Sequence, residues 1–316
     1  MEARVANGTL VYRYTLDNEY PPPMIEYVPV RWVAFVFSAV FPLLAIRAVA
    51  VGRAVRAPWI CAAALAPLLL FIALVLRGAA GAWDGDAFRM YETQTVLHLC
   101  AGHVLVGVLL AFAAKWYVRW IEIESQAVAG VFLGHVGIAY TATALVFTCV
   151  GFPLAFDASE ERRISGYRLV SAGLITALGM VLLGATLALY HTDARRGAGG
   201  AGAAAQRLTV IWVPAALLVC WAAFALARMS LPMAAAANRS EALFYCLAVL
   251  PAAGALAVWT GQAEELLLAD TGADADKGQP RGACRCEREM MSAADPCQAV
   301  CYRYEASLQR AMQKYA

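Results

Sequence analysis

The stretch Ala57–Leu76, APWICAAALAPLLLFIALVL, has no charged side chain in 20 consecutive residues, and Arg77 follows it directly. A helix that crosses the roughly 30 Å of hydrocarbon in a bilayer needs about 20 apolar residues. The run is rich in Ala and Leu and lacks the polar–apolar alternation of a membrane β-strand. It therefore predicts one membrane-spanning helix.

Six further stretches of the same kind lie on either side of this one. They are Val30–Val51, Thr93–Ala114, Val128–Val150, Gly166–Tyr190, Leu208–Ala227 and Ala242–Thr260. Of the 316 residues, 61% are hydrophobic and 15% are charged, whereas soluble chains carry about 25% charged residues. We predict an all-α polytopic membrane protein, a seven-transmembrane-helix bundle. The net charge of +2 gives no indication of nucleic-acid binding.

Arginine and lysine favour the loops after the first, third and fifth spans, so we expect the N-terminus outside the cell. Residues 1–29 are then an extracellular segment, 30–260 the seven-helix transmembrane domain, and 261–316 a cytosolic, largely disordered, Cys-containing tail. Asn7, in an Asn-Gly-Thr sequon, is a glycosylation candidate on the outer side. We expect a multi-pass protein of the plasma membrane, with endosome or vacuole as alternatives.

The tail cysteines follow the pattern C-x-C-x10-C-x3-C, which matches no common zinc site. Palmitoylation at Cys284 and Cys286, free thiols and a metal site remain open as interpretations, with metal the least favoured. The chain has no H-E-x-x-H, G-x-S-x-G or P-loop motif, so we predict neither an enzyme nor ATP-driven transport, and no metal or cofactor.

Two histidines in the third span, His98 and His103, are five residues apart. Five residues turn an α-helix by about 500°, which leaves the two side chains about 140° apart around the axis. They cannot bind one ion from a shared face. A histidine within a span usually faces the bundle interior, so lining of a polar cavity is the favoured interpretation.

The seventh span begins with the sequence EALFYCLAVLP, from Glu241 to Pro251. The helix dipole favours a carboxylate at this position, and Tyr245 follows one turn later on the same face. The pair is either an interfacial cap with an aromatic anchor, or the polar mouth of a cavity between helices. Arg77, at the end of the second span, either extends to the membrane surface or binds a lipid phosphate.

These residues resemble motifs of the fungal RTA-like family of seven-span lipid-translocating exporters. The family's E-x-x-x-Y-x-x-D-x-x-P signature is matched by Glu241, Tyr245 and Pro251, with Ala248 in place of the aspartate. Other family positions are matched, in order, by Tyr27-Val28-Pro29, Arg77, Tyr91, Gln94, Gly166 and Gly173. Two further acidic positions differ, because Leu70 replaces a glutamate and His135 an aspartate.

The resemblance covers roughly residues 27–260 and implies export or flopping of lipids, sphingoid bases or amphipathic toxic compounds, of the kind that confers resistance. Membrane lipids or amphipathic small molecules are then the expected partners. The side chains expected along the substrate path are Arg77, Gln94, His98, His135, Glu241 and Tyr245. A seven-helix receptor or sensor is the alternative, and a scaffold that acts through its tail is the third.

Overall fold

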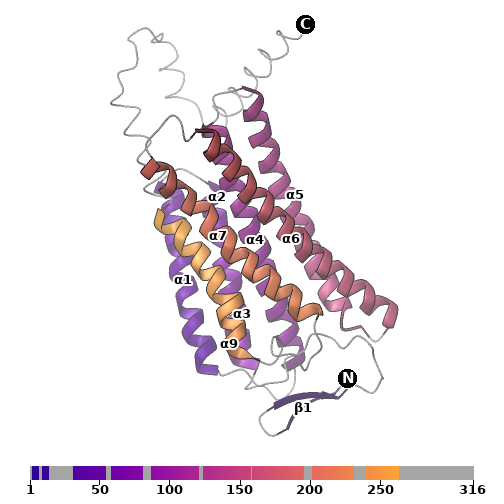
Figure 1. Cartoon of the computed structure of the whole chain (residues 1–316). Helices are drawn as coiled ribbons and strands as arrows, with labels where there is room; N and C mark the ends of the chain where they lie inside the picture. Colours follow the sequence, from indigo (N-terminus) through magenta and orange to yellow (C-terminus); the bar gives the residue numbers. More distant parts are fainter. Residues whose placement is uncertain are drawn as a thin grey trace, which may run out of the picture.

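The computed structural model describes residues 2–6, 9–13, 31–54, 58–80, 87–120, 124–157, 159–195, 201–230 and 240–262. Within these ranges, seven helices are long and apolar enough to cross a membrane. The predicted all-α seven-helix bundle is thereby confirmed, and the chain is compatible with an integral multi-pass membrane protein. Figure 1 shows the helices running side by side between two ends of the bundle.

The elements occur in the order that the apolar runs predict. They are α1 (Arg31–Ala54), α2 (Pro58–Ala63), α3 (Leu65–Ala80), α4 (Ala87–Trp120), α5 (Glu124–Leu154), α6 (Glu160–Arg195), α7 (Ala201–Ser230), α9 (Glu241–Phe244) and the π-helical turn η1 (Tyr245–Val249). Helices α2 and α3 together make the second span. Helix α9, η1 and the helical residues 250–262 make the seventh.

A proline explains why the second span is divided into α2 and α3. Pro67 has no N–H group and cannot donate a hydrogen bond to the carbonyl of Ala63. The backbone therefore makes a turn at Ala64, whose N–H bonds to the carbonyl of Cys61 at 3.1 Å. Helical bonding resumes where Leu68 N–H bonds to the Ala64 carbonyl at 3.3 Å. The span is interrupted for one residue and then continues.

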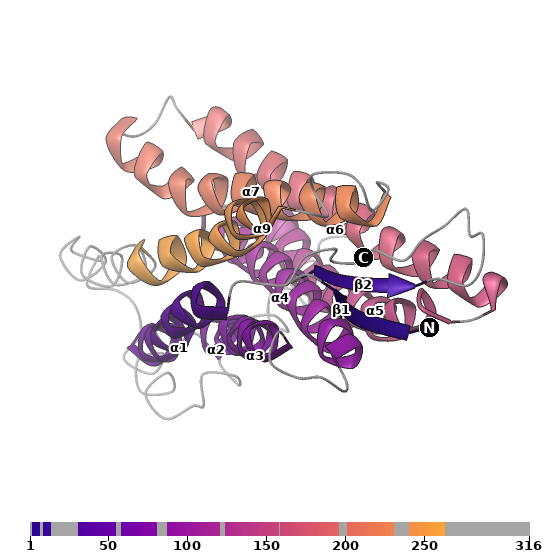
Figure 2. The same ribbon diagram turned by 90° about the horizontal axis from the view of Figure 1, so that it is seen from below.

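Helix α4 lies at the centre of the bundle, as Figure 2 shows from one end. Of the 18-residue hydrophobic stretch in its span, 78% is buried, whereas the corresponding stretches of the other six spans are 28% to 50% buried. Two glycines permit this close packing, because a Cβ at Gly102 would lie 1.9 Å from the Trp221 ring and one at Gly107 would lie 2.1 Å from Thr141 Oγ1. Small residues at helix crossings are the usual means of close packing in lipid.

A two-stranded hairpin, which was not predicted, precedes the bundle. Strands β1 (Glu2–Ala6) and β2 (Thr9–Arg13) pair antiparallel, with Glu2 opposite Arg13. The hairpin lies at the end of the bundle where α1 and α9 begin (Figure 1). The glycosylation candidate Asn7 and the tail residues Cys284 and Cys286 lie outside the described residues, so those predictions stay predictions.

Candidate functional site

The seventh span starts with a capped turn that leaves Glu241 available for another partner. Ser240 is the N-cap, and its hydroxyl accepts a hydrogen bond from the backbone N–H of Leu243 at 3.2 Å. Glu241 occupies the first turn, where the helix dipole favours a carboxylate. The capping role that the sequence allowed for Glu241 is therefore performed by Ser240.

Glu241 faces Arg77, which reaches it from the last turn of α3. Arg77 Nε lies 3.9 Å from Glu241 Oε1, and the two side chains are 1% and 15% exposed. Arg77 therefore does not extend to the surface, and that alternative is wrong. Its guanidinium carbon lies 4.1 Å from the centre of the Phe244 ring, a distance typical of a cation–π contact.

Tyr245 follows Phe244 and begins the π-helical turn η1. In this turn the backbone N–H of Leu250 bonds to the Tyr245 carbonyl, five residues back. Pro251 favours such an irregularity because it has no N–H to donate to the preceding turn. The buried Tyr245 ring stacks on Phe37 of α1, with ring centres 4.7 Å apart. Single π-turns within helices are frequent at functional sites.

A second arginine, Arg228 in the last turn of α7, approaches the same phenylalanine. Its guanidinium carbon lies 5.6 Å from the centre of the Phe244 ring, and its Nη2 donates to the Tyr91 hydroxyl at 3.4 Å. Phe244 thus contacts two guanidinium groups that come from different helices. We call Arg77, Arg228 and Glu241 the ion cluster; it holds two positive charges and one negative charge.

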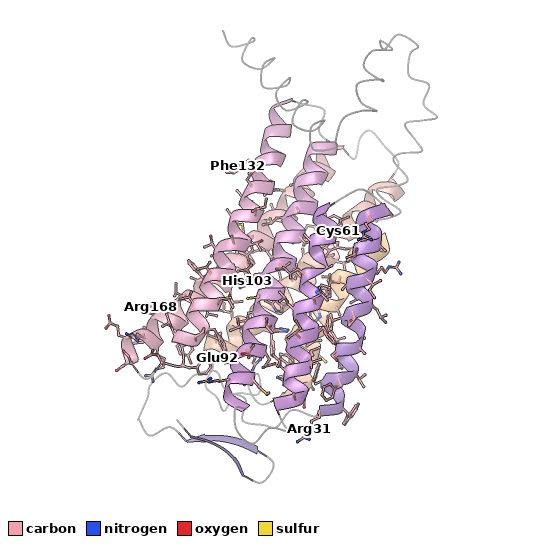
Figure 3. The ribbon with its side chains drawn as sticks, turned by 180° about the vertical axis from the view of Figure 1, so that it is seen from behind. Arg31, Cys61, Glu92, His103, Phe132 and Arg168 are labelled. Carbon is pink, nitrogen blue, oxygen red and sulfur yellow. The ribbon has the colours of Figure 1, made fainter. Side chains whose placement is uncertain are left out.

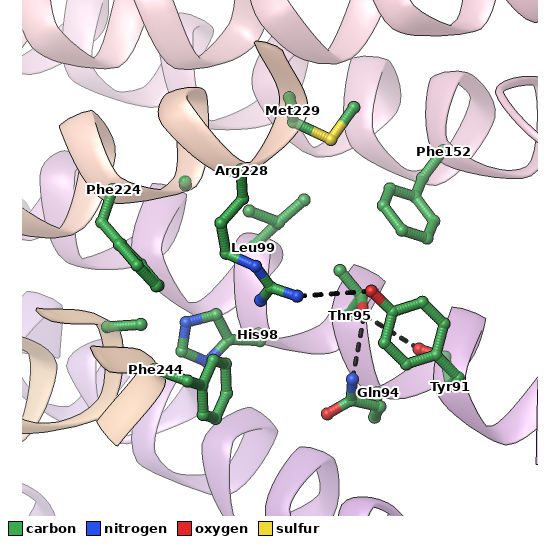
Figure 4. Close-up of a pocket in the computed structure, with 12 residues that line it drawn as sticks. Tyr91, Gln94, Thr95, His98, Leu99, Phe152, Phe224, Arg228, Met229 and Phe244 are labelled. Carbon is green, nitrogen blue, oxygen red and sulfur yellow. Dashed lines mark hydrogen bonds between the residues drawn. The ribbon is translucent and has the colours of Figure 1, made fainter. Parts of the chain in front are cut away.

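A small cavity lies next to the ion cluster, between α4, α7 and the seventh span (Figure 4). Its volume is about 30 Å³, which is room for one or two water molecules. Its polar lining consists of Tyr91, Gln94, Thr95, His98 and Arg228. The apolar remainder includes Phe152, Phe224 and Phe244. The cavity therefore has polar groups from α4 and α7 and an apolar, largely aromatic surface elsewhere.

Several polar atoms of this lining have no hydrogen-bond partner among the described residues. They are both ring nitrogens of His98, Gln94 Oε1 and Arg228 Nε. Gln94 does donate to the Thr95 hydroxyl at 3.0 Å, and that hydroxyl donates to the Tyr91 carbonyl at 2.9 Å. A buried polar group without a partner is unfavourable by about 1–3 kcal/mol. The lining is therefore suited to a polar occupant.

Five of the six predicted path residues lie at one end of the bundle. One group consists of Arg77, Glu241 and Tyr245. The other two residues, Gln94 and His98, line the cavity. The Phe244 ring lies between this group and the cavity, with its centre 5.2 Å from that of the His98 ring.

The sixth residue, His135, lies apart from the other five, and its place in a substrate path stays a prediction. His135 is exposed on α5, toward the opposite end of the bundle, three residues from Phe132 (Figure 3). Because α5 runs antiparallel to α4, the start of its span lies far from Gln94 and His98.

The sequence interpretation missed Arg228 and the role of Tyr91. The available signal was position, because the spans alternate in direction and both α3 and α7 end at the same side of the membrane. Arg77 and Arg228 close those two helices. Two arginines at equivalent helix ends are expected at the same depth in the membrane. The sequence alone does not show that both contact the Phe244 ring.

In the described ranges, no three His, Cys, Asp or Glu side chains gather as a metal site. His98 and His103 diverge as predicted, since His98 packs on Phe244 while His103 bonds to Tyr140 of α5 at 2.8 Å. The site therefore offers charge, hydrogen bonding and aromatic surface.

Comparison with protein-family models, with curated proteins and with solved structures finds no match.

Proposed function

We propose that this protein is a translocator of lipids, sphingoid bases or other amphipathic compounds, which acts without ATP and without covalent chemistry. The observation that carries the proposal is the ion cluster, held among the ends of three spans beside a small cavity with a partly polar lining. Charged side chains within membrane spans are rare because they are unfavourable there, and they mark functional paths by default. The resemblance to the RTA-like family supports the same class, with the plasma membrane as the proposed location.

Both signs of charge in the cluster suit the headgroups of such molecules. A guanidinium group binds phosphate oxygens through paired hydrogen bonds, which Arg77 and Arg228 offer. A carboxylate such as Glu241 attracts the ammonium group of a sphingoid base. The aromatic side chains Phe244 and Tyr245 offer apolar surface next to these groups. A molecule with a charged head and an apolar tail matches this combination.

Translocation requires the small cavity to widen. At about 30 Å³ the cavity admits water and no headgroup, so α3, α4, α7 and the seventh span must separate. The Arg77–Glu241 contact, at 3.9 Å, joins α3 to the seventh span and has to break in that step. With no nucleotide motif in the chain, movement follows an existing gradient of substrate or of a coupled ion.

The test is movement of fluorescent phospholipid and sphingoid-base analogues across liposomes that contain the purified protein. We expect movement above that of empty liposomes, and a loss of at least about tenfold in the Arg77→Met and Glu241→Gln variants. The matched controls are Arg162→Met and Glu160→Gln, the same changes at exposed positions at the same end of the bundle. Equal movement in all four variants contradicts the site, and no movement by the folded wild type contradicts translocation.

A receptor or sensor is the second candidate, and the small volume of the cavity favours it. A cluster that joins three helices without a continuous path suits a two-state switch. Stimulus-dependent recruitment of a partner to residues 115–127, which include the end of α4 and the start of α5, with no lipid movement in liposomes, supports this function over translocation.

A further inference from the structure

The interior of the bundle at the end of the ion cluster carries an excess of positive charge. Arg77 is 1% exposed and Arg163, near the start of α6, is 5% exposed, and no aspartate or glutamate of the described residues is buried to that degree. Arg228 is half-buried and lines the cavity. The carboxylate nearest to these groups, that of Glu241, is 15% exposed and lies against Arg77. Three guanidinium groups therefore share one carboxylate.

The other half-buried carboxylates at this end already face arginines on the outside of the bundle. Asp157 Oδ2 lies 3.5 Å from Arg162 Nη1, and Arg162 is 69% exposed. Glu92 interacts electrostatically with the exposed Arg89, three residues before it in α4. Neither carboxylate forms an ion pair with an interior arginine in the described part of the chain. The interior therefore has no negative charge beyond that of Glu241.

The two arginines outside the Arg77–Glu241 contact are linked through tyrosines. Arg228 Nη2 donates to the Tyr91 hydroxyl at 3.4 Å. Tyr167, one turn after Arg163 in α6, interacts electrostatically with both Arg163 and Tyr91. The Nε atoms of both arginines have no hydrogen-bond partner among the described residues. A buried charge without a counter-charge is strongly unfavourable, so this arrangement calls for an anion.

All three arginines lie at the depth of lipid headgroups. Arg77 and Arg228 each lie two residues before the end of their span, and Arg163 lies three residues after the start of its own. At 1.5 Å per residue they are about 3–5 Å inside the ends of the spans. The headgroup layer on each side of the hydrocarbon is roughly 5–8 Å thick. The anionic oxygen atoms of a membrane lipid are therefore available at this level.

The excess of guanidinium groups selects phosphate over ammonium. A guanidinium group binds two phosphate oxygens through paired hydrogen bonds. An ammonium group would approach three like charges, and the one carboxylate, Glu241, is already in contact with Arg77. Phe244 contacts two of the arginines but supplies no net charge.

We propose that this end of the bundle binds the phosphate group of a membrane amphiphile. Arg228 makes the direct contact, because it lines the cavity and is the least buried of the three arginines, and Arg163 adds positive charge behind it. The proposal rests on the proposed function, since it narrows the substrates of the same site to anionic amphiphiles and excludes sphingoid bases.

The test measures binding to the full chain in micelles of a neutral maltoside detergent, which contains neither phosphate nor ammonium groups. Radiolabelled dodecyl phosphate is the probe, and dodecylammonium and inorganic phosphate are the competitors. We expect saturable binding of dodecyl phosphate that dodecylammonium does not displace at equal concentration. Inorganic phosphate should compete only at concentrations at least about tenfold higher, because it lacks the apolar chain. Equal potency of inorganic phosphate assigns the site to a free ion and overturns the proposal, as does displacement by dodecylammonium.

Three variants make the test specific to Arg228. Arg228→Gln should weaken binding of dodecyl phosphate by about 10- to 100-fold, the effect of losing hydrogen bonds to a charged group. Arg228→Lys keeps the charge without the paired geometry and should retain part of the affinity. The matched control is Arg168→Gln, the same change at an exposed arginine of α6 at this end of the bundle (Figure 3). Equal binding by wild type and folded Arg228→Gln, or an equal loss in Arg168→Gln, overturns the proposal.

A change at Glu241 separates the two signs of charge. Glu241→Gln removes the one interior carboxylate, so it should leave binding of dodecyl phosphate unchanged or stronger; a loss of binding overturns the proposal. The lipid-movement assay is a separate measurement. Specific phosphate binding by a protein that moves no lipid contradicts translocation alone, whereas movement of sphingoid-base analogues without phosphate binding contradicts the present proposal alone.

Discussion

Replacement of Arg77 by methionine should destabilise the bundle through Glu241. The change removes the guanidinium 3.9 Å from a carboxylate that is only 15% exposed, together with the contact to Phe244 at 4.1 Å. Breaking a fully buried ion pair removes about 3–5 kcal/mol, and a cation–π contact contributes about 0.5–2 kcal/mol. The long N–O distance and the partial exposure of Glu241 reduce the first value. We therefore expect a loss of about 2–3 kcal/mol.

A double-mutant cycle isolates the ion pair from the packing change. Arg77→Met and Glu241→Gln, alone and together, are compared by reversible unfolding in mixed micelles. We expect a coupling free energy of about 1–1.5 kcal/mol, within the range for residues in direct contact. The control cycle is Arg162→Met with Asp157→Asn, a pair at 3.5 Å whose side chains are 69% and 29% exposed. No measurable coupling is expected there, and equal coupling in both cycles would refute the argument from burial.

Three further predictions concern positions outside the cluster. Gly166→Ala should destabilise the protein by about 2–3 kcal/mol in the same unfolding assay, because its Cβ meets backbone 2.3 Å away, while Gly179→Ala should change nothing. Ser240→Ala should remove about 1 kcal/mol by loss of the N-cap, and an unchanged midpoint would contradict that role. The Ser159 backbone N–H donates a hydrogen bond to Asp157 and lowers the pKa of that carboxyl group below its ordinary value of 3.8. Ionised Asp157 therefore contributes its full stabilisation at pH values above 3.8. Its stabilisation relative to Asp157→Asn should disappear as the pH falls through the lowered pKa, and a constant difference down to acid pH would contradict this.

The number of spans was predictable because burial in lipid imposes a simple length rule on apolar runs. Ala57–Leu76 satisfies it alone, and its interruption at Ala64 follows from Pro67. The hairpin of β1 and β2 was not predictable in the same way. Its strands are five residues long and carry no long-range hydrophobic signal.

The site was predictable where a residue's depth in the membrane follows from its place in a span. Arg77 and Glu241 lie at adjoining span ends on one side of the membrane, and the structure brings them together. His135 was assigned because it occupies the position of an aspartate in the family motif, and a motif position does not decide which way a side chain points around its helix. Arg228 was missed because its contact with Phe244 depends on how α7 packs against the seventh span.

The two histidines of α4 separate what helix geometry decides from what packing decides. Five residues rotate the helix by about 500°, so His98 and His103 had to face different neighbours whatever the bundle looked like. The sequence could not say which neighbours, because those depend on close approaches such as Trp221 against Gly102. That ring fills the space beside Gly102 and meets His103 edge-on, which leaves the imidazole to bond to Tyr140 and to face Gly173. The missing side chain at Gly102 thus contributes to the direction in which the imidazole of the next residue points.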